Sequence, residues 1–351
     1  MGTRRFYLVL VIAALVVIAI DVARLASFKQ KRCEAWIRRS GGKLAFWLPL
    51  EAAAKLHLPY AWAAVAVYQD SIDPIRRPLT ISSECPEPHA YLADLGWTQW
   101  QEIPQINSEG TQDSAAYKMR KVHLRAEVWS SKSEGKVIVA FGGTAAASLE
   151  DWNSNLRWLR TPLDVLPASM QVEDAYDVVT KVFVSTFAKA YLARASEAGN
   201  DWMRSAQVIA TGHSLGAGLA ERFAYSLNKD YGVPLTKEVY AFDPTPVSGK
   251  RSVPRWWEQA KGLTIYRIYN RGEILASIRS LLALAENPPE GQGQKWIDIR
   301  YLDNWTWRTL LPSGWVHAHA MFDFACFLKR GTEPSFAESS TPCSRTTGKR
   351  D

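Results

Sequence analysis

The chain opens with fifteen consecutive apolar residues, Phe6–Ile20, behind two arginines. A helix over this run is about 22 Å long at about 1.5 Å per residue. Extending it to Ala26 reaches the ~30 Å hydrocarbon core of a bilayer but includes Asp21 and Arg24. No clean small-residue cleavage pattern follows the run, which favours an uncleaved membrane anchor over residues 1–28 rather than a cleaved signal peptide.

The next part of the chain shows no sustained strand pattern. Residues 45–69 are rich in alanine and leucine and predict a helix interrupted by two prolines, and residues 70–110 combine five prolines with many polar residues. We therefore predict a helical and irregular N-terminal extension over residues 29–114.

Strand and helix patterns alternate from residue 115 onward. Such alternation predicts a mainly parallel sheet covered by helices on both faces, in an α/β domain over residues 115–330. The predicted strands are 119–129, 136–141, the apolar run 208–210, 238–242 and 263–269. The predicted helices are 172–195, 217–227 and an apolar run from 321 to 328. Residues 331–351 are rich in Ser, Thr, Pro and charge, which predicts a disordered tail.

The charge of the chain suits a lipid surface better than a nucleic acid. Its net charge is +7 and its pI about 9.1, but the basic residues are scattered and no nucleic-acid recognition motif accompanies them. The fifteen Trp residues suit an apolar site or a membrane interface. Four widely spaced cysteines without a C-x-x-C pair argue against zinc, and Cys326 in its apolar run is expected to behave as a small buried hydrophobe.

Two rules disagree on the orientation of the anchor. The basic residues that follow the apolar run favour a cytoplasmic catalytic part, whereas the short basic segment before it resembles an export signal. We expect a single N-terminal anchor. Export of the catalytic domain is slightly favoured, and the two rules leave its side of the membrane open.

The most informative motif is QVIATGHSLGAG, residues 207–218. An apolar run leads into Gly-His-Ser-Leu-Gly and a helical pattern follows, as in the nucleophile elbow of serine hydrolases. The elbow lifts Ser214 above the sheet as a nucleophile and directs the Leu215 amide at the oxyanion that forms during attack. The flanking strand and helix patterns distinguish this match from a chance G-x-S-x-G.

A serine nucleophile needs a base, and an acid that orients the base. In the hydrolase order of serine, acid and histidine, the base comes last, which leaves His317 and His319. We favour His319, because a helical apolar run starts directly after it. Two carboxylates follow predicted strands downstream of the serine: Glu273, in the commoner place for the acid, and Asp243, which precedes a proline and could equally be a turn residue.

A second oxyanion donor is expected in the loop after an earlier strand. The segment Phe141-Gly-Gly-Thr144 fits, since its glycines let the backbone approach the site and Thr144 carries both an amide and a hydroxyl.

Together these segments resemble the class 3 (fungal-type) lipase family of α/β-hydrolases. The resemblance rests on VIVAFGGT (137–144), DWNSNL (151–156), VIATGHSLGAGLA (208–220) and YRIYNRGEIL (266–275), in the order of the family. It implies an α/β-hydrolase fold, Ser214 as nucleophile, Thr144 and Leu215 as oxyanion donors, and Glu273 where the family usually has aspartate. The chain departs from the family at Gly142, where arginine is usual, and in AFDPTPV (241–247), which keeps Asp243 a candidate.

We therefore predict a serine esterase acting on lipid esters, a lipase of triacylglycerol or related lipids, without metal or organic cofactor. Its expected partners are the acyl-ester substrate and a membrane, and not nucleic acid. The alternatives are a phospholipase of membrane glycerophospholipids, an acyltransferase that uses the same acyl-enzyme, and an inactive hydrolase fold that binds lipid or a partner.

Overall fold

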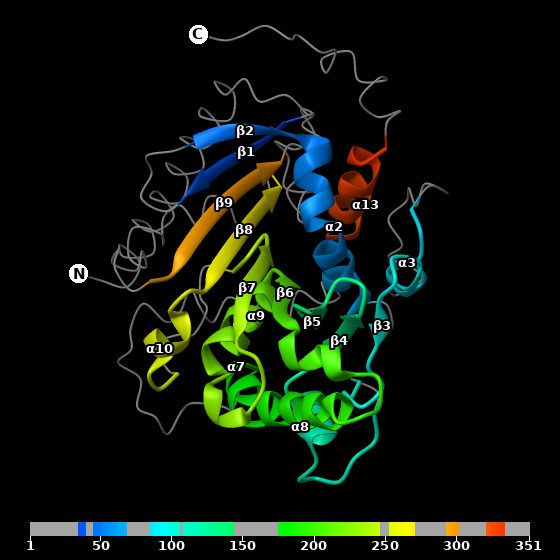
Figure 1. Cartoon of the computed structure of the whole chain (residues 1–351), viewed down its shortest axis with the longest axis vertical. Coiled ribbons are helices and arrows are strands. Elements are labelled where there is room, and N and C mark those ends of the chain that lie inside the picture. Colours follow the sequence, from blue (N-terminus) through cyan, green and yellow to red (C-terminus); the bar gives the residue numbers. More distant parts are fainter. Residues whose placement is uncertain are drawn as a thin grey trace, which may run out of the picture.

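The strands of the molecule form one nine-stranded sheet in the order β2-β1-β9-β8-β7-β6-β5-β4-β3 (Figure 1). The computed structural model describes residues 34–39, 45–68, 85–105, 108–143, 175–245, 253–270, 293–301 and 321–333. The strands are β1 (Glu34–Arg39), β2 (Ala45–Pro49), β3 (Thr98–Gln99), β4 (Ala126–Ser131), β5 (Lys136–Phe141), β6 (Gln207–His213), β7 (Thr236–Phe242), β8 (Thr264–Asn270) and β9 (Lys295–Tyr301).

The sheet is mixed. Strands β5 to β9 run parallel to one another, while β4 and β3 at one edge and β1 and β2 at the other are antiparallel to their neighbours. The prediction of a mainly parallel sheet therefore holds for the five central strands only. Their carboxyl ends lie along one rim, where ligands bind in open α/β sheets.

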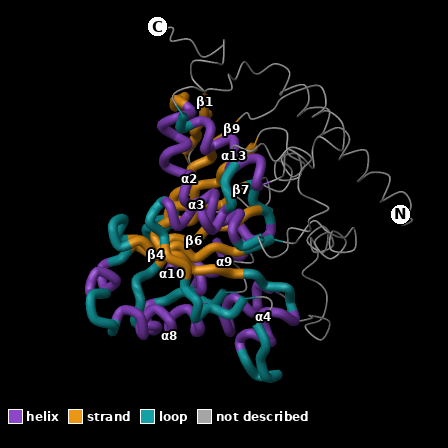
Figure 2. Tube along the Cα trace, turned by 90° about the vertical axis from the view of Figure 1, so that its right-hand side faces the viewer, coloured by secondary structure: helices purple, strands orange, loops and turns teal. Residues whose placement is uncertain are grey.

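Helices cover both faces of the sheet, as predicted (Figures 1 and 2). The helices are α2 (Leu50–Ala66), α3 (Pro88–Asp94), α4 (Ala115–Lys121), α7 (Ala175–Val178), the π-helix η4 (Val179–Phe183), α8 (Val184–Ala195), the 3₁₀ helices η5 (Asp201–Ser205) and η6 (Lys229–Tyr231), α9 (Leu215–Ser226), α10 (Trp256–Ala260) and α13 (Met321–Gly331). Helices α2 and α13 pack against one face, and α8, α9 and α10 against the other.

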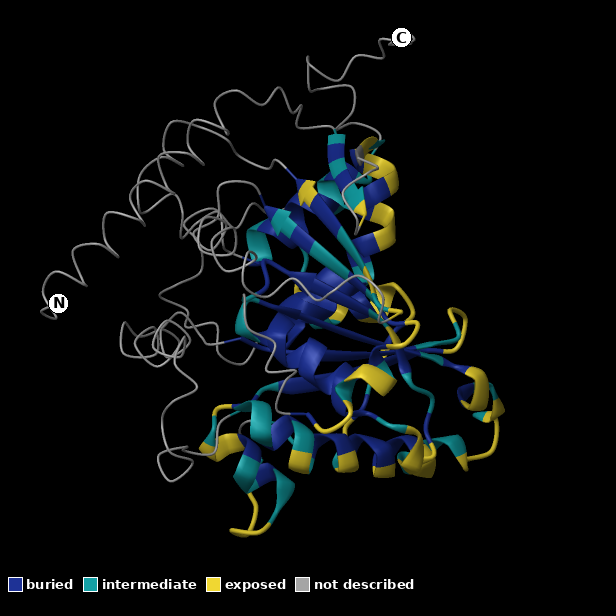
Figure 3. Ribbon diagram, turned by 90° about the vertical axis from the view of Figure 1, so that its left-hand side faces the viewer, coloured by how far each residue is buried: buried dark blue, intermediate teal, exposed yellow. Residues whose placement is uncertain are grey.

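Strands β5 and β6 are buried on both sides after their first residues, which explains their apolar sequences (Figure 3). In β5, Val137 and Val139 join the core under α8 and α9, whereas Ile138 and Ala140 join the core under α2 and α13. The alternation of side chains along a strand divides the interior into these two cores.

The N-terminal region differs from the prediction. Residues 34–39 and 45–49 were expected to be helical or irregular and form β1 and β2 instead, so that part of the prediction is wrong. The Ala-rich helix is present as α2, with Pro59 inside it. The polar and aromatic residues of β1 alternate with Ala35 and Ile37, which are buried against α2 and α13.

Two further segments differ from the sequence prediction. The single strand predicted over 119–129 is divided between the end of α4 and the beginning of β4, and β9 was not predicted. The predicted anchor over 1–28 and most of the predicted tail, residues 334–351, lie outside the described residues. Among the helices that are described, none has the length and apolar character needed to cross a bilayer.

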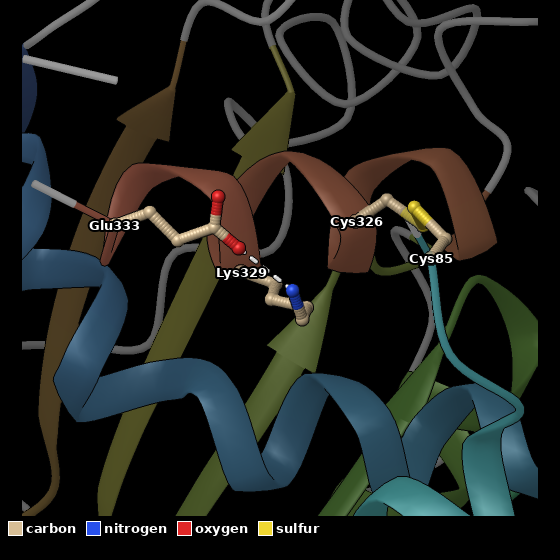
Figure 4. The surroundings of a disulfide bond; sticks show 4 residues. All are labelled: Cys85, Cys326, Lys329 and Glu333. Carbon is tan, nitrogen blue, oxygen red and sulfur yellow. Dashed lines mark hydrogen bonds and ion pairs between the residues drawn. A yellow bond between two sulfur atoms is a disulfide. The ribbon is translucent and has the colours of Figure 1, made fainter. Parts of the chain in front are cut away.

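Cys326 is buried, as expected, but it is bonded rather than free. It forms a disulfide with Cys85, 241 residues away in the sequence, and the two Cα atoms are 5.7 Å apart. Figure 4 shows that the bond joins α13 to the segment just before α3. The opposite end of α13 carries an ion pair between Lys329 and Glu333, at 2.7 Å.

His57 on α2 is buried among tyrosine rings from β7, β8 and β9. Its Nδ1 lies 2.6 Å from the hydroxyl of Tyr301, and the rings of Tyr240 and Tyr266 lie 5.9 and 6.4 Å away. Burial lowers the pKa of His57 to about 3, because the interior disfavours the charged imidazolium. The folded protein therefore holds His57 neutral over the physiological range.

This lowered pKa predicts that the protein loses stability in mild acid. The unfolded chain binds a proton at His57 below about pH 6.5, and the folded chain binds it only near pH 3. Between these values the unfolded state holds more protons, so stability falls as pH falls, by about 2–3 kcal/mol from pH 7 to 4.5. Urea unfolding of wild type and His57→Gln across this range measures the effect. Equal pH dependence in the two proteins would contradict it.

Candidate active site

Ser214 occupies the turn between β6 and α9, and its backbone has the strained geometry of a nucleophile elbow. Its φ is 56° and its ψ is −121°, values that residues with a Cβ rarely adopt. Two hydrogen bonds from the neighbouring strand hold this conformation: the Ser214 amide donates to the Phe242 carbonyl at 2.9 Å, and the Thr245 amide donates to the Ser214 carbonyl at 3.1 Å. The predicted strand–turn–helix is thus present at the carboxyl rim of the sheet.

Close backbone packing explains the two glycines of the motif. A Cβ on Gly216 would lie 2.2 Å from the carbonyl oxygen of Phe141, and one on Gly212 would lie 2.4 Å from backbone atoms of Gly216. The absence of side chains at these two positions lets the first turn of α9 pack directly against the carboxyl end of β5. Leu215 is the first residue of α9, where amides have no acceptor within the helix, so its N–H suits a developing oxyanion.

Tyr68, directly after α2, is a residue near the site that sequence reasoning missed. Its hydroxyl accepts a hydrogen bond of 2.5 Å from the amide of Gly143, and its ring meets that of His213 edge-on at 6.4 Å. Burial raises the pKa of Tyr68 to about 12, with the Gly143 amide and Arg125 acting in the opposite direction, so the hydroxyl stays protonated at neutral pH. A lone tyrosine after an Ala-rich helix carries no sequence signal for such a role.

Removing this hydroxyl is expected to loosen the segment that leads into Thr144. In Tyr68→Phe the amide of Gly143 loses its acceptor in a part-buried position, which costs about 1–3 kcal/mol. We expect kcat for a soluble ester to fall about tenfold. The matched control is Tyr117→Phe on α4, far from this contact. Wild-type kcat in the Tyr68 variant would show that its hydrogen bond does not position the loop.

Asp243 lies directly after β7, beside the elbow, and only 1% of it is exposed. Its backbone amide donates to the Ile268 carbonyl at 2.7 Å, and its Oδ1 accepts a hydrogen bond of 3.0 Å from the Asn270 amide. Its φ is 39°, in the left-handed region that Asp tolerates better than most residues. The carboxylate is therefore fixed between the ends of β7 and β8.

The structure thus brings together Ser214, Leu215 and Asp243 at the rim. The other predicted site residues, Thr144, Glu273, His317 and His319, lie outside the described residues. Within the described residues, no cluster of three or more His, Cys, Asp and Glu side chains is arranged to hold a metal ion.

A mixed sheet between two helical layers, with a serine on a strand–turn–helix elbow, fits the α/β-hydrolase fold. Residues 138–282 match the family model of class 3 lipases, which covers β5, the elbow, β7 and β8. The match agrees with the resemblance to class 3 lipases seen in the motifs, and it spans less than half of the chain.

Solved structures with similarity to this chain include several fungal lipases. A fungal lipase–inhibitor complex is 15% identical with a TM-score of 0.35, covering 66% of this chain and 73% of that chain. Lip2 lipase from Yarrowia lipolytica is 16% identical with a TM-score of 0.37, covering 66% and 75%. The native propeptide complex of Rhizomucor miehei lipase is 16% identical with a TM-score of 0.37, covering 74% and 72%. A search of curated protein sequences finds no match.

Proposed function

We propose that the chain hydrolyses acyl esters of lipids, with Ser214 as the nucleophile. The observation that carries this proposal is the elbow, where the backbone of Ser214 is held at φ 56° between a buried strand and the start of α9. A fold keeps such strain where function requires it. The class 3 lipase match over the same segment supports a lipid ester as the substrate class.

The proposed reaction proceeds through an acyl-enzyme. Ser214 attacks the ester carbonyl while the base, His319 or alternatively His317, takes its proton. The amides of Leu215 and Thr144 donate hydrogen bonds to the oxyanion, and the imidazolium then protonates the departing alcohol. Water, deprotonated by the same base, attacks the acyl-enzyme and releases the fatty acid. The carboxylate that orients the base is Glu273 or Asp243.

The test is fatty-acid release by the full chain, purified in detergent, from a panel of esters. A short-chain p-nitrophenyl ester reports the chemistry alone, while triacylglycerol emulsions and phosphatidylglycerol vesicles report the lipid class. We expect turnover of triacylglycerol or a related neutral lipid. Preference for the vesicles would identify the phospholipase alternative, and no turnover of any ester would contradict the proposed function.

We further propose that the protein acts at a membrane to which its N-terminal segment anchors it. Strand β1 begins beside the carboxyl end of β9, because Trp36 pairs with Arg300, and that end belongs to the rim that carries Ser214. Residues 29–33 reach at most about 18 Å when extended. An anchor ending at residue 28 would therefore keep the rim of the sheet close to the bilayer.

The hairpin of β1 and β2 suits that position. Its neighbouring residues Phe46 and Trp47 are each 40% exposed, and the guanidinium of Arg300 lies 5.0 Å from the ring of Trp36. Aromatic rings beside cationic groups are typical of membrane interfaces. Retention of the full chain in the membrane fraction after alkaline carbonate washing tests the anchor, and release into the supernatant would contradict it.

The side of the membrane is a separate proposal. We favour export, and the disulfide between Cys85 and Cys326 supports it, because structural disulfides persist in oxidising compartments. The redox state of the two cysteines is measured by lysing cells in denaturant that contains maleimide–polyethylene glycol, which adds mass to each free thiol. Full modification of both cysteines without prior reduction would favour a cytoplasmic domain instead.

A further inference from the structure

The edge of the sheet formed by β2, β1 and β9 combines arginines with exposed aromatic rings (Figure 1). Given the proposed action on lipid esters, on which this inference rests, we propose that this edge is a docking surface for the headgroups of anionic phospholipids. The protein then selects a bilayer by its surface charge as well as by its apolar interior.

The strand pairing places aromatic and cationic side chains in one row across three strands. Trp47 of β2 lies opposite Trp36 of β1, and Trp36 lies opposite Arg300 of β9. Side chains directly opposite in antiparallel strands share a face, so the two indole rings and the guanidinium point to the same side of the sheet. Arg300 is exposed, and its guanidinium lies 5.0 Å from the Trp36 ring. An arginine packed on a ring buries its stem and keeps its charged head in water.

A second pair of an arginine and an aromatic ring lies on the opposite face of the same hairpin. The guanidinium of Arg39 lies 5.9 Å from the Phe46 ring, and both residues are exposed. Phe46 and Trp47 are neighbours on β2 and therefore project to opposite faces of the sheet, each 40% exposed. The edge of the sheet thus presents exposed rings and arginines on both of its faces.

The charges around this edge leave it positive. Asp298 of β9 has a side chain only 6% exposed and lies 2.7 Å from Arg38 and 2.6 Å from Arg267. Burial alone would raise the pKa of Asp298, but the two arginines outweigh burial and hold this pKa below its usual range. The carboxylate therefore stays charged and offsets one of these arginines, and the half-buried Glu34 of β1 offsets the other. The exposed arginines of the two aromatic pairs carry the remaining positive charge.

This positive charge favours a lipid surface over a second copy of the chain. Strand β2 is the last strand of the sheet, and the outer side of such a strand can pair with an identical one. Pairing of that kind would bring the arginines of two copies together, and like charges at close range repel. An anionic bilayer offers negative headgroups to the arginines and an interface in which aromatic rings are stable.

The aromatic row also lies at the rim of the candidate active site. Arg300 is the last residue but one of β9, and the carboxyl end of β9 belongs to the rim that carries Ser214. Strand β6, which leads into Ser214, is four strands away from β1, about 19 Å at ~4.8 Å per strand. A bilayer that contacts the row therefore lies beside the nucleophile.

The experiment measures partition of the full chain onto vesicles of phosphatidylcholine alone and of phosphatidylcholine with phosphatidylglycerol. The ratio of the two partition coefficients isolates the effect of lipid charge, because apolar contributions are common to both vesicles. We expect Arg39→Gln and Arg300→Gln each to lower this ratio about fivefold, the scale of one arginine at an anionic surface. The matched control is Arg120→Gln on α4, since Arg120 is also exposed and lies 5.9 Å from an aromatic ring, that of Tyr117.

The aromatic part of the surface has a different signature. Trp47→Ser should weaken partition onto both vesicles and leave their ratio unchanged, because an indole ring contributes to the interface without charge. Its control is Trp257→Ser on α10, where the side chain is 47% exposed but belongs to another surface. In the wild-type chain, amide hydrogen exchange over residues 34–39 and 45–49 should be slower on the vesicles with phosphatidylglycerol.

The arginine variants decide the proposal, since both residues are exposed and their replacement should leave the melting temperature close to that of wild type. A ratio that falls no further in Arg39→Gln and Arg300→Gln than in Arg120→Gln overturns it. Protection of β2 that grows with protein concentration in the absence of vesicles also overturns it, because a second copy then occupies the edge. Failure of the proposed function is distinguishable, since neither measurement needs turnover: the wild-type chain would then hydrolyse no ester and still respond to phosphatidylglycerol.

Discussion

Replacing Ser214 with alanine is expected to lower ester hydrolysis at least a thousandfold, which corresponds to about 4 kcal/mol of transition-state stabilisation. The hydroxyl is the group that forms the acyl-enzyme, and alanine offers no nucleophile in its place. The fold should survive, because serine and alanine both carry a Cβ and the hydrogen bonds that hold φ at 56° come from the backbone. The melting temperature should therefore stay close to that of wild type.

Fluorophosphonate labelling of the full chain gives the sharpest measurement, since the probe reacts with an activated serine independently of the lipid substrate. We expect labelling of wild type and none of Ser214→Ala. Ser185→Ala is the control, because Ser185 is an exposed serine of α8 whose hydroxyl donates to the Val182 carbonyl in η4. Labelling that persists without Ser214 would place the nucleophile elsewhere. A folded wild type that is never labelled would favour the binding-protein alternative.

The elbow could be predicted from the sequence because everything that defines it is local. Two glycines, the serine and the flanking apolar and helical patterns lie within a dozen residues, and each is there for a contact that the structure contains. The buried parallel strands were predictable for a similar reason, since burial on both faces gives β5 and β6 continuous apolar runs.

Features that depend on distant parts of the chain could not be predicted in this way. β2 reads as apolar sequence continuous with α2, and only its pairing with β1 makes it a strand. The partner of Cys326 lies 241 residues away, so no spacing rule identifies it. Tyr68 became part of the site only because α2 crosses the sheet and ends beside Gly143. In each case the decisive contact joins segments that folding alone brings together.

Gly216→Ala is expected to disable the elbow without touching the nucleophile. The added Cβ would lie 2.2 Å from the carbonyl oxygen of Phe141 and 2.8 Å from the amide nitrogen of Gly143. These are backbone atoms, so no side-chain rotation relieves the clash, and α9 must move away from the exit of β5. That movement separates the Leu215 amide from the segment leading to Thr144, and with it the two predicted oxyanion donors.

We therefore expect kcat to fall about a hundredfold or more, on the scale of a lost oxyanion donor, and the free energy of unfolding to fall by about 3 kcal/mol. Gly135→Ala is the control for replacing a glycine without a clash: its φ of 61° disfavours alanine, but no atom lies within 4 Å of the new Cβ. It should cost about 1 kcal/mol of stability and leave kcat unchanged. Ester turnover and urea unfolding of both variants separate the steric effect from the general cost of replacing glycine. If Gly216→Ala behaves like Gly135→Ala, close packing of α9 on β5 is not what assembles the site.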